Sequence, residues 1–108
     1  MSYDRIGVIG AMDSELAALI AALAQPARET VQGLVFHTGR LGAREVVLVR
    51  CGIGKVSAAR CTQVLIDRFA PDAVINTGIA GGLASGLAVG DIVVADGLVQ
   101  HDFDAAPI

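Results

Sequence analysis

Residues 5–23 read RIGVIGAMDSELAALIAAL, and in this stretch a short apolar run passes through a glycine into a longer periodic segment. The β-branched run from Arg5 to Ile9 predicts a strand that ends at Gly10. The segment beyond it has apolar side chains at the i, i+3, i+4 and i+7 spacing of one helix face, namely Leu16, Leu19, Ile20 and Leu23. A strand that leads into a helix through a glycine turn is typical of α/β proteins.

Local signals bound this helix and place the next strands. We expect Asp13 to be the N-cap of the helix and Pro26 to stop it. Residues 34–38 and 45–50 predict two strands, and the glycine-bearing loop 39–43 between them predicts an antiparallel pair.

The strand and helix alternation continues to the end of the chain. Residues 55–69 predict a helix with Ala58, Cys61, Leu65 and Phe69 inward, ending before Pro71. Residues 73–76 predict a buried strand, and residues 91–95 predict another apolar strand. We therefore expect an α/β fold with a mixed, mainly parallel sheet flanked by helices, in which residues 1–108 form an incomplete single domain.

Composition limits the possible partners. The 108 residues are 54% hydrophobic and 18% charged, which excludes a disordered chain and predicts exposed apolar surface unless the chain belongs to a larger fold or an oligomer. The net charge of −3 argues against a nucleic-acid partner. No secretory signal or 18-residue apolar run is present, and the two cysteines make no disulfide framework, so we expect a cytoplasmic protein with reduced thiols and no membrane span.

Three glycine turns follow three of the apolar strands, at residues 10–12, 52–55 and 78–82. In open α/β sheets, ligands bind where such turns meet at the carboxyl ends of the strands, although each turn alone could be an ordinary connection. Nucleotide motifs fit poorly, because Val49 stands where a Walker A loop has its first glycine and Val56 where it has Ser or Thr. The dinucleotide fingerprint also lacks its third glycine, since position 57 is Ser.

Glu15 is the carboxylate that we single out. It falls in the first helical turn beside the first glycine turn, where a negative charge also complements the helix dipole, so a catalytic and a purely structural role both remain open.

Other polar residues give weaker signals. The spacing of His101, Asp102 and Asp104 matches no strong metal motif and favours a loop that hydrogen-bonds its own backbone. We interpret Cys51 as a buried filler and His37 as a surface residue. Lys55 either contacts an anion or caps a solvated helix start, and we favour the second.

Four ordered segments resemble the amino-terminal half of the 5′-methylthioadenosine/S-adenosylhomocysteine nucleosidases, in the purine nucleoside phosphorylase-like superfamily. They are IGVIGAMDSEL at 6–16, CGIGKVSAA at 51–59, INTGIAGGLASGLAVGDIVVAD at 75–96 and QHDFD at 100–104. The resemblance implies a phosphorylase/hydrolase-like fold and hydrolysis of the N-ribosidic bond of both nucleosides, with release of adenine. It implies a homodimer in methionine salvage, with neither a metal nor an organic cofactor.

The resemblance also implies roles for single residues. Glu15 would activate the attacking water, Met12 and Ile53 would line the ribose and water side, and Ala80 and Gly81 would contact the nucleoside. Ile79 stands where many members have serine, which affects the water network and the preferred substrate. The purine-side aspartate of the family lies beyond Ile108, so we expect residues 1–108 alone to be inactive or nearly so.

Rival interpretations remain. A nucleoside phosphorylase is disfavoured, because Glu15 and Ile53 occupy the place of its phosphate-binding arginines. A hydrolase of another purine nucleoside, such as futalosine, fits the same scaffold. A non-catalytic nucleotide-binding module, in which Glu15 only complements its helix, is the alternative from another class.

Overall fold

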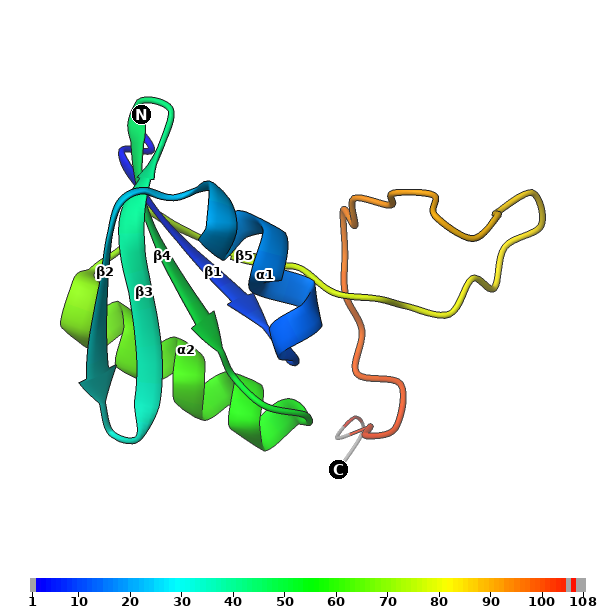
Figure 1. Cartoon of the computed structure of the whole chain (residues 1–108). Helices are drawn as coiled ribbons and strands as arrows, with labels where there is room; N and C mark the ends of the chain where they lie inside the picture. Colours follow the sequence, from blue (N-terminus) through cyan, green and yellow to red (C-terminus); the bar gives the residue numbers. More distant parts are fainter. Residues whose placement is uncertain (1, 105, 107–108) are drawn as a thin grey trace.

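The computed structural model describes residues 2–104 and 106, and its ordered part is a five-stranded sheet with two helices (Figure 1). The sheet order is β2-β3-β4-β1-β5. The elements are β1 (Arg5–Gly10), α1 (Asp13–Ala22), β2 (Ala24–Val31), β3 (Leu34–Leu41), β4 (Arg44–Arg50), α2 (Lys55–Phe69) and β5 (Ala73–Asn76). The expected α/β class is confirmed.

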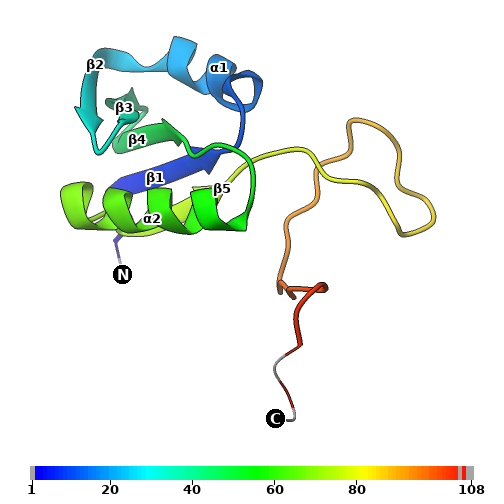
Figure 2. The same ribbon diagram turned by 90° about the horizontal axis from the view of Figure 1, so that it is seen from below.

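The sheet is mixed, as expected. β1 runs parallel to both β4 and β5, whereas β2, β3 and β4 form an antiparallel run. The two helices cover opposite faces of this sheet, with α2 beneath it and α1 above it in Figure 2. Three parallel neighbours therefore end at one edge of the sheet, between the two helix layers.

Alternation along β4 divides the core between the two helices. Val47 and Val49 face α2 and pack in a cluster with Cys61, whereas Val46 and Leu48 face α1 and pack in a second cluster with Leu16. Successive side chains of a strand point to opposite faces, so one apolar run serves both layers. The core is thus two thin layers, one on each face of the sheet.

The start and end of α1 correct two expectations. Met12 is the N-cap, and Asp13 is the first residue of the helix rather than its cap. Pro26 does not stop the helix, because α1 has already ended at Ala22 and Pro26 lies in β2. β2 was not expected, since the sequence AQPARETV has no apolar period, and it is an edge strand, where a proline is tolerated.

The central hairpin and α2 follow the sequence more closely. α2 spans the expected residues, and Cys61, Leu65 and Phe69 are buried as predicted. The hairpin loop is shorter than expected, because β3 continues to Leu41 and leaves only residues 42–43 as the turn before β4.

The last two strand predictions are wrong in part. β5 forms, but it is an edge strand with Ile75 52% exposed, so it is not buried. Residues 91–95 are not a strand; they lie in a segment that leaves the helix and sheet layers (yellow to red in Figures 1 and 2), and Ile92, Val93 and Val94 are exposed. A β-branched run becomes a strand only where a partner strand is within reach, and the described residues give it none.

Cys51 and Cys61 are both buried free thiols in the cluster that faces α2. Burial, assisted by the nearby Cys51, raises the pKa of the Cys61 thiol from 9.0 to about 11. A pKa that is higher in the folded state stabilises the fold below the unfolded value, and this contribution is lost as the pH rises through the folded value.

We expect the free energy of unfolding of the wild-type protein to fall between pH 9 and about 11 relative to that of Cys61→Ala, which has no thiol to ionise at this position. Urea denaturation of both proteins at pH 8, 9, 10 and 11 measures this difference. Parallel curves over that range would show that Cys61 ionises alike in the folded and unfolded states.

Candidate active site

The three glycine turns lie side by side, because the strands that precede them are neighbours in the parallel part of the sheet. Backbone hydrogen bonds continue past the strand ends: Cys51 N donates to Gly10 O at 2.8 Å, and Thr77 N donates to Ile9 O at 3.0 Å. The turns after β1, β4 and β5 thus form one edge, as the sequence predicted.

Glu15 lies at this edge, in the first turn of α1. Its Oε2 accepts hydrogen bonds from Ala11 N at 2.7 Å and from Met12 N at 3.0 Å. These N–H groups have no partner inside the helix, so the carboxylate satisfies the helix start and is held in one orientation. Glu15 therefore has the structural role that the helix dipole suggested.

The other carboxylate oxygen faces the turn after β5. Ile79 N donates a long hydrogen bond of 3.4 Å to Glu15 Oε1. A Cβ atom on Gly78 would lie 3.1 Å from the same oxygen, closer than an ordinary van der Waals contact, so a larger residue there would require the carboxylate or the turn to shift. Glu15 is half-buried and joins two glycine turns rather than pointing into bulk solvent. The sequence predicted Gly78 only as part of the third glycine turn, and its contact with Glu15 was not expected.

The other expected site residues differ in their position relative to Glu15. Met12 is half-buried directly beside it. Ile79, Ala80 and Gly81 line an open cavity of about 630 Å³ that the segment 78–93 forms with itself. Ile53 lies on the neighbouring turn after β4, with 79% of its surface exposed.

The remaining polar candidates behave differently from one another. Cys51 is buried, as expected, and its thiol donates to Gly52 O at 3.1 Å. Asp104 accepts from Ala106 N at 3.0 Å, in agreement with a loop that bonds its own backbone. The described residues contain no group of three or more His, Cys, Asp or Glu side chains that could hold a metal ion.

Lys55 was expected to cap a solvated helix start, and the structure shows a different role. Its Nζ lies 2.7 Å from both carboxylate oxygens of Asp102, so it contacts an anion supplied by the chain itself. The pKa of Asp102 is lowered, mainly by the hydrogen bond from Lys55. The sequence contained a signal for this contact: Lys55 is a cation at the first residue of a helix whose first turn has no acidic residue.

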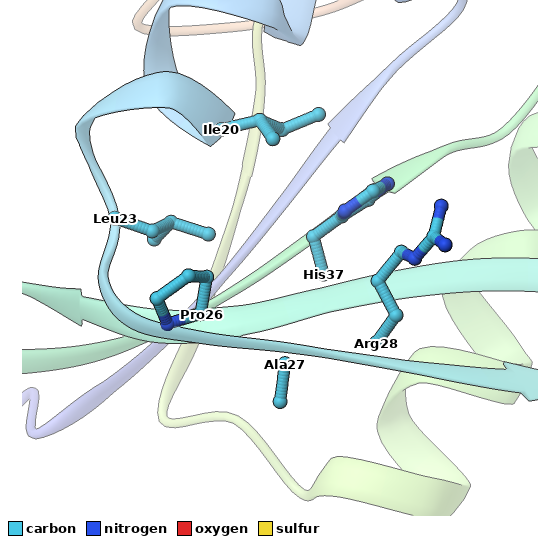
Figure 3. Close-up of a pocket in the computed structure, with 6 residues that line it drawn as sticks. All are labelled: Ile20, Leu23, Pro26, Ala27, Arg28 and His37. Carbon is cyan, nitrogen blue, oxygen red and sulfur yellow. The ribbon is translucent and has the colours of Figure 1, made fainter.

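A separate pocket of about 320 Å³ lies between α1 and the β2-β3 hairpin (Figure 3). Arg28 and His37 come from paired positions on the two strands and point to the side of Ile20 and Leu23. His37 is half-buried here, not a surface residue. None of the residues expected at the site lines this pocket.

Comparison with known proteins gives the family. The model of the phosphorylase superfamily matches residues 5–108, nearly the whole chain. The chain belongs to the phosphorylase superfamily. It is 48% identical over 93% of its length to the 5′-methylthioadenosine/S-adenosylhomocysteine nucleosidase of Shewanella pealeana, and it spans only 44% of that protein.

Solved structures of superfamily members superpose on this chain and support the same family. An S-adenosylhomocysteine nucleosidase from Streptococcus pyogenes, in complex with 5-methylthiotubericidin, superposes with a TM-score of 0.93 and 47% identity over 97% of this chain and 44% of that one. The futalosine hydrolase of Helicobacter pylori superposes with a TM-score of 0.86 and 33% identity over 95% of this chain and 45% of that one. The chain thus spans less than half the length of the relatives that it matches.

Within the described part of the chain, neither helix is long and apolar enough to cross a membrane.

Proposed function

We propose that the protein of which these residues form the amino-terminal part hydrolyses the N-ribosidic bond of 5′-methylthioadenosine and S-adenosylhomocysteine and releases adenine. One observation carries the proposal: Glu15 is fixed between the turns after β1 and β5 in a chain 48% identical to nucleosidases of that name. Glu15 contacts the turn after β5 as well as its own helix, which capping of α1 alone does not require.

The chemistry assigns different tasks to the two oxygens of Glu15. Breaking the bond builds positive charge on the ribose, so one carboxylate is needed to deprotonate water and a second acid to protonate the leaving purine. Oε2 accepts from two backbone donors, whereas among the described residues Oε1 accepts only the long hydrogen bond from Ile79 N. Oε1 is therefore the atom that accepts the proton of water and faces the developing cation.

The neighbouring residues fit the substrate side of this reaction. Met12 and Ile53 would line the ribose and water region, and Ile79, Ala80 and Gly81 would contact the nucleoside along the turn after β5. The second acid would come from the carboxyl-terminal half, which relatives of more than twice this length have room to supply. We place the protein in the cytoplasm as a homodimer that needs neither metal nor organic cofactor.

Ile79 also favours a second candidate, a hydrolase of another purine nucleoside such as futalosine. An apolar side chain replaces the serine expected near the ribose and changes the water network there. The scaffold is compatible, since the futalosine hydrolase of Helicobacter pylori shares 33% identity with this chain.

A nucleoside panel tests the proposal. We expect the complete protein to release adenine from methylthioadenosine and adenosylhomocysteine at the same rate with and without phosphate, and residues 1–108 alone to release almost none. Faster cleavage of futalosine would favour the second candidate, and dependence on phosphate would identify a phosphorylase. Equal rates for the complete protein and residues 1–108 would refute the need for a second acid.

A further inference from the structure

The start of α2 has a charge that its own helix disfavours. Lys55 is the first residue of the helix, the first turn contains no acidic residue, and no side chain caps it. The unpaired N–H groups at a helix start have partial positive charge, so a lysine there is unfavourable without an anion nearby. Local rules broken in this way tend to mark positions with another task.

Asp102 supplies the missing anion from 47 residues further along the chain. Both of its carboxylate oxygens lie 2.7 Å from Lys55 Nζ. The carboxylate thus pairs with the lysine and brings negative charge to the start of α2.

This contact fixes the far end of a long irregular segment. At its near end, Thr77 and Ile79 are held by β1 and Glu15. Between Ile79 and Asp102 the segment has no helix or strand. Ala88 N donates to the Asp91 carboxylate at 2.9 Å and Asp91 N donates to Ala88 O at 3.1 Å, and both hydrogen bonds are internal to the segment. The two anchors lie at turns on the same edge of the sheet, so both ends of the segment that lines the cavity of residues 78–93 are held at that edge.

We propose that Lys55 and Asp102 are positioning residues: their ion pair clamps the far end of the segment 79–102 at the start of α2 and so sets the affinity for substrate. The inference rests on the proposed function, because the segment carries Ala80 and Gly81. Neither residue of the pair takes part in the chemistry.

The test uses the complete protein with Lys55→Met and Asp102→Asn. An exposed ion pair contributes little energy, so we expect KM to rise about two- to fivefold while kcat changes much less. Lys55→Arg should keep the wild-type KM, and Lys55→Glu combined with Asp102→Lys should restore most of it. Glu29→Gln is the matched control, because it alters a somewhat less exposed pair with Arg68 that joins β2 to α2 away from the glycine turns.

Limited proteolysis within residues 79–102, with a protease that cleaves after apolar residues, gives a readout that does not depend on any activity. Faster cleavage in Lys55→Met and Asp102→Asn, but not in Glu29→Gln, together with a raised KM, supports the clamp. Unchanged cleavage overturns it, whether or not the protein is a nucleosidase. Faster cleavage with an unchanged KM for an active enzyme overturns the positioning role.

Discussion

Glu15→Gln is expected to lower kcat of the complete protein by roughly two to four orders of magnitude, the usual contribution of a general base. Glutamine keeps the size of the side chain and an oxygen that can accept from Ala11 N and Met12 N, so the start of α1 should persist. What is lost is the charged oxygen beside Ile79, which the proposed mechanism needs both to take a proton from water and to stabilise the ribosyl cation.

Two measurements separate the catalytic role from the structural one. Adenine release from methylthioadenosine gives kcat, and calorimetric titration with an uncleavable nucleoside analogue gives Kd, which should stay near the wild-type value. Glu45→Gln is a suitable control, because Glu45 is a half-exposed carboxylate paired with Arg5 at the other end of the sheet. If Glu15→Gln turned over as fast as Glu45→Gln, Glu15 would have only its role at the start of the helix.

The elements that could be predicted from the sequence are those with two independent local signals. α2 has an apolar period, and a glycine and a proline bound it, so its ends were correct. β1 combines β-branched residues with a following glycine turn. β2 has neither signal, and its pairing with β3 determines its conformation, so no local pattern could reveal it.

Long-range pairing also explains the errors at the other end of the chain. Residues 91–95 have the composition of a strand, but composition does not provide a partner, and here the run stays exposed. The same reasoning applies to β5, whose apolar side chains were expected to be buried although it lies at the sheet edge.

The candidate site was predictable in outline for a physical reason. Parallel neighbours end at one edge, so glycine turns after such strands must meet there, and a first-turn glutamate must lie beside them. To predict the contact between Glu15 and Ile79, one must also know that β5 lies next to β1. To predict the pairing of Lys55 with Asp102, one must know the path of the irregular segment between them and the sheet. Neither can be read from spacing along the chain.

The second large effect concerns stability, and it is expected from Phe36→Ala. Phe36 is 0% exposed on β3, and its ring centroid lies 4.9 Å from that of Phe69, at the end of α2. Truncating a buried phenylalanine removes its transfer free energy and leaves a cavity, so we expect the free energy of unfolding to fall by about 3–5 kcal/mol. Domains of ordinary stability have about 5–15 kcal/mol in total, so much of the margin would be lost.

Val35→Ala is the matched control, since Val35 is the preceding residue of β3, on the other face of the sheet, and is 40% exposed. It should cost less than about 1 kcal/mol, because little apolar surface is lost from a core. Urea denaturation of the complete protein, with both variants and the wild type, gives the two differences. Phe36 contacts the end of α2 that lies opposite Lys55, the first residue of the same helix. If Phe36→Ala lowered the free energy of unfolding no more than Val35→Ala, α2 would be held against the sheet by something other than this aromatic contact.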